Sequence, residues 1–163
     1  METSTPTTPT SAVFSQRHAV RFAHCDPAGI IFFPQYFIML NGVVEDWFTQ
    51  ALGINYATLI GERRVGLPTV SLQCDFVAPS RMGEHITFNL SVARIGKRSI
   101  NLDIACTGPD GGPRLRMRQV LVTTSLATHQ SMDIPPDVRS ALTLWNTTSD
   151  SNTNTTTTGA TAP

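Results

Sequence analysis

Hydrophobic side chains follow two different periods along the middle of this chain. In the first part they recur every three or four residues, at Phe37, Leu40, Val44, Trp47, Phe48 and Ala51. That spacing places them on one face of a helix, so the pattern predicts a helix over about 34–52. Proline suits the first turn of a helix and glycine often follows the last, so Pro34 and Gly53 mark its ends.

From Val70 onward the period changes from 3.6 to 2. Apolar and polar residues alternate strictly in three segments, namely 70–76, 86–92 and 100–106. This alternation predicts three half-buried strands. A further strand over 115–126 shifts phase near Gln119-Val120, which indicates a bulge or burial on both faces.

Glycine and proline separate these elements. Ile95-Gly96-Lys97-Arg98 fits a two-residue hairpin turn with glycine where a type II′ turn needs it, and 109–113 fits a looser turn. Strand-like residues over 13–22 precede a loop at 24–29, and 135–145 fits a short helix.

The predicted order is therefore a strand, a long apolar helix and four strands in a meander. A helix this apolar needs cover, and an antiparallel sheet that curls around it provides that cover. We therefore expect an α+β fold. Its exposed sheet edges favour association with another chain.

The two ends of the chain differ from the middle in composition. Residues 1–12 are rich in Thr, Pro and Ser, and residues 146–163 contain eight threonines and no large apolar side chain. Such segments bury too little surface to offset their ordering entropy. We expect both to be disordered, on either side of one folded domain at 13–145.

Composition and charge exclude several classes of function. The formal net charge is zero, which does not favour a nucleic-acid partner. No stretch approaches the roughly 20 apolar residues of a membrane span, and no signal peptide is evident, so we expect a cytoplasmic protein without a membrane partner. Cys25, Cys74 and Cys106 form no CxxC pair, which argues against a disulfide framework or a metal site.

The segment from His24 to Tyr36 carries the candidate chemistry. Asp26 lies in a Pro/Gly loop shortly before Pro34. A helix N-terminus presents unpaired N–H groups that can hold an oxyanion, and a nearby carboxylate can attack a carbonyl or activate water. Together these are two parts of an acyl-transfer site, although an Asp before Pro is also an ordinary turn former.

The same segment resembles the signature of the 4-hydroxybenzoyl-CoA thioesterase family of hotdog proteins. Asp26, Gly29, Pro34 and Tyr36 match that signature, and the resemblance extends over about 17–128. It includes Gly66-Leu67-Pro68, Phe76 and the basic turn Lys97-Arg98-Ser99.

The resemblance implies a hotdog fold, in which an antiparallel sheet wraps around one long central helix. It also implies acyl-CoA hydrolysis without a metal or organic cofactor, by a homodimer or homotetramer.

The resemblance also implies roles for individual residues. Asp26 corresponds to the family's nucleophile or general base, and the backbone N–H of Phe33 to the group that polarises the thioester carbonyl. Substrate contacts fall to six residues: Gly29, Phe32, Tyr36, Asn41, Lys97 and Arg98. Of these, Lys97 and Arg98 correspond to residues that meet the CoA phosphates. Asn41 stands where the family has an acidic residue that recognises a ring hydroxyl, so the ring substituent of the expected aryl-CoA, such as a (hydroxy)benzoyl-CoA, is left open.

Three alternatives remain at this point. Cys25 is a second candidate nucleophile with His24 as its base, although adjacent residues in an extended loop point apart. Glu45 on the helix is a reserve carboxylate. A non-catalytic acyl-CoA-binding protein or a dehydratase-type hotdog protein is the rival function, but a dehydratase is expected to carry a catalytic His in its motif, and the residues around His24 fit the thioesterase signature better.

Overall fold

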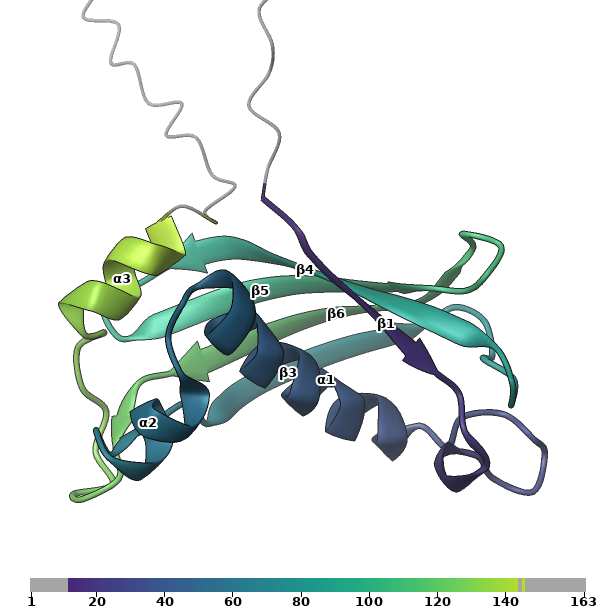
Figure 1. The fold of residues 1–163 in the computed structure, drawn as a ribbon, viewed down its shortest axis with the longest axis horizontal. Helices are drawn as coiled ribbons and strands as arrows, with labels where there is room; N and C mark the ends of the chain where they lie inside the picture. Colours follow the sequence, from purple (N-terminus) through teal and green to yellow (C-terminus); the bar gives the residue numbers. More distant parts are fainter. Residues whose placement is uncertain (1–11, 144, 146–163) are drawn as a thin grey trace, which may run out of the picture.

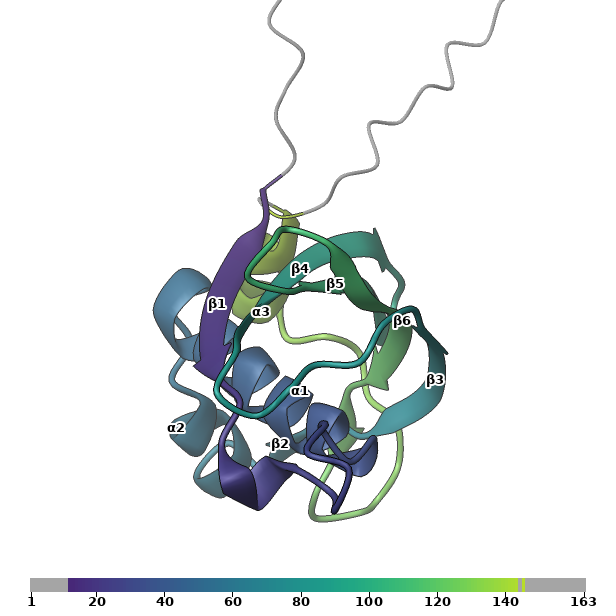
Figure 2. The ribbon, with the colours of Figure 1, turned by 90° about the vertical axis from the view of Figure 1, so that its right-hand side faces the viewer.

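The computed structural model describes residues 12–143 and Trp145. Its central feature is helix α1 (Pro34–Asp46), which lies across one face of a five-stranded sheet (Figure 1). Seen end-on, the sheet curls around this helix (Figure 2). The predicted α+β hotdog architecture is thereby confirmed. Among the described residues, no helix combines the length and the apolar character that crossing a membrane requires.

The strand order of the sheet differs from the predicted meander. The five strands are β1 (Phe14–Ala19), β3 (Thr69–Phe76), β4 (His85–Ile95), β5 (Ser99–Thr107) and β6 (Pro113–Val122). Their order is β1-β4-β5-β6-β3, and all neighbours are antiparallel. The meander covers only β4 to β6. Because β1 already pairs with the first half of β4, β3 joins the sheet at the opposite edge, beside β6.

The core lies between α1 and the inner face of the sheet. The helix continues as a π-helical segment, η2 (Trp47–Ala51), and Gly53 ends it with a φ of 69°, so the predicted limits are confirmed. Trp47 and Phe48 are completely buried, as are Phe88 on β4 and Ile100 on β5. Burial of each such side chain stabilises the folded state by about 1.5–3 kcal/mol of free energy.

The apolar side of β3 is exposed, which the sequence did not predict. Pairing of Phe76 with Leu115 and of Leu72 with Gln119 places these β3 side chains on the inner face, as the alternation indicates. Yet Leu72 is 39% exposed, Phe76 51% and Val70 60%. The expectation of a half-buried strand is therefore wrong for β3, because an edge strand has a covered neighbour on one side only.

Shorter elements complete the fold. They are η1 (Phe22–His24), α2 (Tyr56–Gly61), α3 (Pro136–Thr143) and a small sheet of β2 (Val65–Gly66) with β7 (Thr124–Ser125). The predicted strand 115–126 thus divides, since β7 leaves the main sheet. The irregularity predicted near Gln119-Val120 of β6 is present on the neighbouring strand. There the register of β3 shifts between Thr69 and Ser71. Except for Ala12, the segments expected to be disordered lie outside the described residues.

Candidate active site

The chain before α1 folds into a small hairpin that carries Asp26. Cys25 pairs with Ile31, and the N–H of Asp26 donates to the carbonyl of Ile30 at 3.0 Å. The N–H of Gly29 closes the turn by donating to the Asp26 carbonyl at 2.9 Å. Gly29 has a φ of 73°, a conformation that glycine adopts without strain.

The Asp26 carboxylate uses one oxygen to hold this turn. Its Oδ1 accepts the N–H of Ala28 at 2.8 Å, and the side chain is half-buried. Within the part of the chain that the structure describes, Oδ2 takes part in no hydrogen bond or ion pair. Asp26 is therefore a turn former and, at the same time, a carboxylate with one oxygen open to a substrate or a water molecule.

The start of α1 leaves one backbone donor unused. Pro34 has no N–H, and the N–H groups of Gln35 and Tyr36 donate to the carbonyls of Phe32 and Phe33 at 2.8 and 3.2 Å. The Phe33 N–H has no acceptor among residues 12–143 and Trp145. It therefore offers a hydrogen bond at the positive end of the helix dipole.

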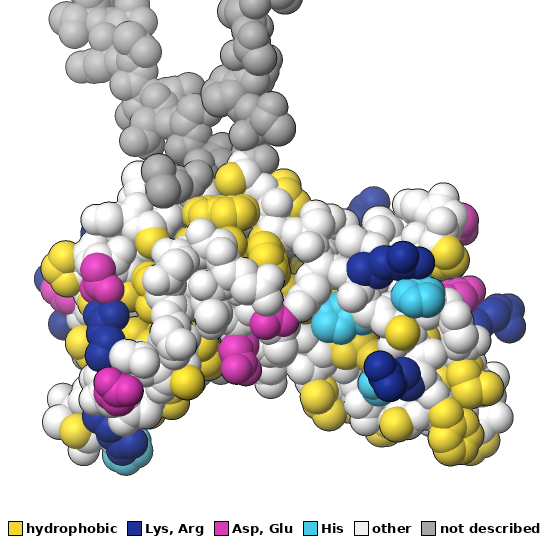
Figure 3. Space-filling view, viewed as in Figure 1, with side chains coloured by type: hydrophobic (Ala, Val, Ile, Leu, Met, Phe, Trp, Pro, Cys, Tyr) yellow, Lys and Arg dark blue, Asp and Glu magenta, His cyan; other side chains and the backbone are white. Residues whose placement is uncertain are grey.

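Exposed aromatic rings surround this donor. Phe32 is 47% exposed and Phe33 54%, and their ring centroids are 5.4 Å apart. Phe33 also contacts Phe76 at the end of β3, with a centroid distance of 6.3 Å. Hydrophobic side chains accordingly gather on the surface at the corner where α1 begins (Figure 3).

Tyr36, expected at the substrate surface, lies in the core instead. It is 3% exposed, and its hydroxyl donates to Oγ of the fully buried Ser80 at 2.8 Å. Burial raises the pKa of the Tyr36 hydroxyl, so the group stays protonated at neutral pH. Ser80 went unnoticed in the sequence, where Pro79-Ser80-Arg81 has the composition of an ordinary loop.

Two further candidates lie along α1, away from Asp26. Asn41 is exposed, about two turns or ~12 Å beyond Phe33 along the helix axis. Glu45 is exposed one turn further on. The single chain therefore does not bring either side chain to the Phe33 N–H.

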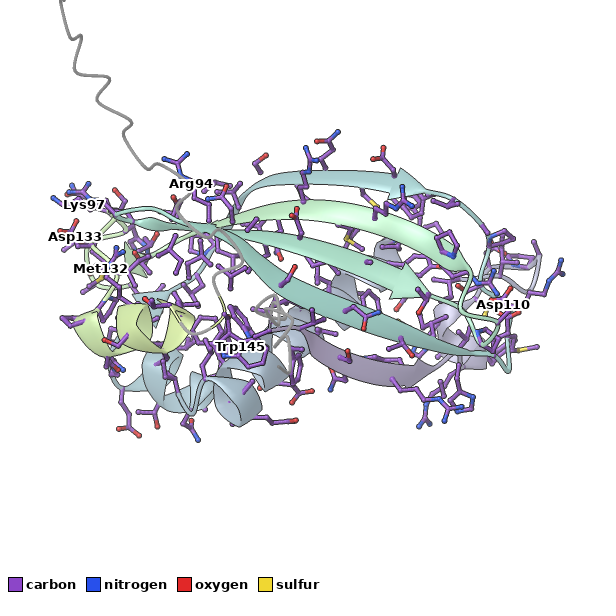
Figure 4. All side chains as sticks on the ribbon, turned by 90° about the horizontal axis from the view of Figure 1, so that it is seen from above. Arg94, Lys97, Asp110, Met132, Asp133 and Trp145 are labelled. Carbon is purple, nitrogen blue, oxygen red and sulfur yellow. The ribbon has the colours of Figure 1, made fainter. Side chains whose placement is uncertain are left out.

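The basic turn lies at the far end of the sheet. The start of β4 adjoins the end of β1, where His85 pairs with Ala19, whereas Lys97 and Arg98 follow the other end of β4, roughly 33 Å away. Figure 4 shows Lys97 beside Asp133 at one end, opposite the end marked by Asp110.

Both cations of this turn contact the same carboxylate. Arg98 Nε is 3.0 Å from Asp133 Oδ1, and Lys97 Nζ is 3.4 Å from Asp133 Oδ2. The hydrogen bond from Arg98 and, after it, that from Lys97 lower the pKa of Asp133. One chain therefore does not place these cations next to Asp26.

The turn itself is not of the predicted type. Gly96 is not among the residues with a positive φ, and its N–H donates to the Ser99 carbonyl at 2.8 Å. Lys97 and Arg98 are therefore the two central residues, and Gly96 precedes them. The type II′ assignment is wrong because that turn needs a positive φ at its first central residue.

The side chains of Cys25 and His24 bind the main chain of the loop rather than each other. The Cys25 thiol donates to the Arg21 carbonyl at 3.4 Å, and His24 Nδ1 accepts the Arg21 N–H at 3.1 Å. His24 thus acts as a hydrogen-bonding residue of the loop, and among the described residues it makes no hydrogen bond to Cys25. The structure shows no group of three or more His, Cys, Asp or Glu within its described part that is suited to hold a metal ion.

Comparison with known proteins identifies the family of this chain. The family model of the thioesterase-like superfamily matches residues 20–142. The 4-hydroxybenzoyl-CoA thioesterase of Pseudomonas sp. (strain CBS-3) is 27% identical over 107 residues, which cover 64% of this chain and 76% of that protein.

Solved structures extend the comparison. A gentisyl-coenzyme A thioesterase is 26% identical with a TM-score of 0.70, covering 80% of this chain and 99% of that one. A 1,4-dihydroxy-2-naphthoyl-CoA thioesterase from Synechocystis, 21% identical, has a TM-score of 0.74 over 81% of this chain and 96% of that one, which shows a common fold. Because the family model spans most of the chain, from the Asp26 hairpin to α3, this protein belongs to the thioesterase-like superfamily.

Proposed function

We propose that the protein is an acyl-CoA thioesterase that hydrolyses an aryl-CoA to the free acid and CoA. One observation carries the proposal: Asp26 keeps a carboxylate oxygen that no described residue binds, in the same hairpin that leads to the Phe33 N–H, which likewise has no acceptor among the described residues. Membership of the thioesterase-like superfamily supports it, as do relatives named for hydroxybenzoyl, gentisyl and dihydroxynaphthoyl thioesters. We expect it to act in the cytoplasm.

The chemistry follows from these two groups. The thioester oxygen accepts the Phe33 N–H, which stabilises the negative charge that develops on it. Asp26 either attacks the carbonyl carbon or removes a proton from a water that attacks. The carbon–sulfur bond then breaks and CoA leaves as the thiolate. The sulfur takes a proton from Asp26 where Asp26 acted as the base, and from water where Asp26 acted as the nucleophile. Along the first route, water hydrolyses the acyl–Asp26 intermediate.

The acyl group is proposed to lie along the flank of α1 that faces β3. Contacts of Phe33 with Phe76 and with Phe37 identify this flank, while Asp46 on the opposite flank binds Gln16 of β1. Asn41 follows Phe37 by one turn on the same flank. With its carbonyl at the Phe33 N–H, an aromatic acyl group would pack against the apolar rings. A polar substituent at its distal end would lie near the Asn41 amide. Gly29 and Phe32 would contact the acyl group from the loop.

We further propose a homodimer joined at β3. This strand ends the sheet. Its exposed Leu72 and Phe76 lie on the inner face, and Val70 is exposed at the register shift of the strand. An unpaired edge with apolar side chains favours a second strand. In a two-fold pair of antiparallel β3 strands, the Lys97–Arg98 end of one subunit comes to the side of the other subunit's Asp26 hairpin. CoA phosphates would then contact cations that one chain holds far from its own site.

A hydrolysis screen tests the proposed function. CoA release is measured with benzoyl-, hydroxybenzoyl-, phenylacetyl- and fatty acyl-CoA. We expect the highest kcat/KM for an aromatic acyl group. Preference for fatty acyl-CoA contradicts the aryl assignment, and no release from any thioester favours the non-catalytic binding protein.

A further inference from the structure

We propose that Ser80 is a positioning residue that fixes the Asp26 hairpin against the first turn of α1. The proposal rests on the proposed thioesterase function. Ser80 is 0% exposed and lies between the end of β3 and the start of β4. It does not touch substrate, because its side chain is enclosed and its Oγ accepts the hydroxyl of Tyr36.

The main chain of Ser80 holds the hairpin. The N–H of Ile31 donates to the Ser80 carbonyl at 2.9 Å, and Ile30 pairs with Arg81 in an antiparallel bridge. The N–H of Met82 donates to the Gly29 carbonyl at 2.9 Å. Residues 80–82 thus lie beside residues 29–31, the second arm of the hairpin, and are joined to them by main-chain hydrogen bonds and an isolated bridge.

The side chain of Ser80 holds the helix. Tyr36 lies in the first turn of α1, three residues after Phe33, and its hydroxyl donates to Ser80 Oγ at 2.8 Å. Tyr36 is 3% exposed, so water does not replace this partner. A buried hydroxyl without a partner is costly, and the two side chains therefore stay together.

Ser80 consequently contacts both halves of the candidate site. Its carbonyl holds the loop that presents Asp26, and its hydroxyl holds the turn that presents the Phe33 N–H. Acyl transfer requires both groups around a single carbonyl carbon, and a displacement of 1 Å costs about 10²-fold in rate. The chain between Asp26 and Phe33 contains a glycine turn, so an external anchor is needed to fix their separation.

Kinetics of Ser80→Ala, Tyr36→Phe and the double variant test this role. We expect each single change to lower kcat roughly 10- to 100-fold with KM within about twofold, because the substrate surface is untouched. The double variant should be no slower than either single variant, since all three remove the same hydrogen bond. Additive losses, or an unchanged kcat in Ser80→Ala, would overturn the proposal.

Asn55→Ala is the matched control for stability. Asn55 caps α2 by accepting the Thr58 N–H at 2.9 Å, at the end of the molecule away from the Asp26 hairpin (Figure 1). Its loss lowers the Tm by a few degrees at most, as the loss of a helix cap does. We expect kcat to be unchanged. An equal fall of kcat in Asn55→Ala and Ser80→Ala would show a general effect of stability and overturn the positioning role.

Hydrogen exchange separates this proposal from the proposed function. The amides of Ile31 and Met82 should exchange faster in Ser80→Ala and Tyr36→Phe than in the wild type, and at the wild-type rate in Asn55→Ala. This readout needs no substrate. If the wild type hydrolyses no thioester, the proposed function falls, and unchanged exchange in Ser80→Ala overturns the anchor independently.

Discussion

At the scale of single residues, the candidate site depends on which polar atoms the fold leaves unused. Asp26 commits Oδ1 to its turn and keeps Oδ2 open, and Pro34 makes Phe33 the last donor before α1 without an acceptor among the described residues. Both features follow from local sequence, because Asp-Pro-Ala-Gly forms the turn and proline starts the helix. The site therefore needs no unusual backbone beyond a glycine with positive φ.

The burial of Cys106 gives a prediction at this scale. Cys106 is completely buried, and burial raises its pKa to about 12. The thiolate is the reactive form, so at pH 8 almost every Cys106 side chain is both protonated and shielded. Iodoacetamide should modify the partly exposed Cys25 of the native protein well before Cys106, as followed by mass spectrometry.

Denatured protein provides the control for that measurement, since all three cysteines should then react. Equal labelling of Cys25 and Cys106 in the native state would show that the β5 core opens readily.

Residue patterns predicted part of the site. The Pro/Gly loop and the start of α1 are visible in sequence, and the resemblance to the thioesterase signature selected Asp26 within that loop as the candidate catalytic residue. The pairing of Tyr36 with Ser80 was not predicted, because it joins residues far apart in the chain. The position of Tyr36 was predicted wrongly for a related reason. A motif shows that a residue lies near the site, but it does not show whether the side chain points to the substrate surface or into the core.

At the scale of elements, periodicity predicted the type of element better than its place. The helix over 34–52 and strands β4 and β5 agree with their patterns because each buries one face. Alternation is the same in a central strand and in an edge strand, so it did not reveal that β3 ends the sheet. The strands β2 and β7 were missed because two residues are too few to show a period.

The turn between β4 and β5 gives the prediction for this scale. Lys97→Ala/Arg98→Ala should raise KM for acyl-CoA several-fold and change kcat little, because phosphate contacts lie far from the reacting carbonyl. Hydrolysis of a truncated thioester without the nucleotide should be unaffected. The effect on KM should shrink as ionic strength rises.

Asp133→Ala is the control for that turn. It removes the carboxylate that both cations contact but leaves the cations themselves, so KM should not rise. Equal effects of the double change on the full and truncated substrates would mean that the turn acts through folding, and its role in CoA binding would have to be dropped.

At the scale of the whole molecule, two features are proposed for one active site, the Asp26 hairpin and the basic turn. Within a single subunit they lie at opposite ends of the sheet. The Asp26 hairpin adjoins the start of β4, and the basic turn follows its end. The exposed apolar side of β3 runs between these two ends. The proposed second subunit at β3 would resolve both features, because it would cover the apolar side chains and bring the two ends together.

Leu72→Glu tests the proposed dimer. It places a charge among the exposed apolar side chains of β3, where a partner would have to desolvate it. We expect sedimentation velocity to show a dimer for the wild type at micromolar concentration and a monomer for the variant. Gln73→Glu is the matched control, since it adds the same charge on the outer face of the same strand and should remain dimeric. A wild type that sediments as a monomer contradicts the dimer.

The central claim is that Asp26 performs the hydrolysis, and the turnover of Asp26→Asn tests it most directly. Asparagine keeps an oxygen that accepts the Ala28 N–H, so the hairpin stays closed while the negative charge is lost. With the best aryl-CoA as substrate, we predict that kcat for CoA release falls about 10²- to 10⁴-fold, the scale of a positioned acid–base group. Turnover close to that of the wild type would contradict the claim and make Glu45→Gln the next variant to measure.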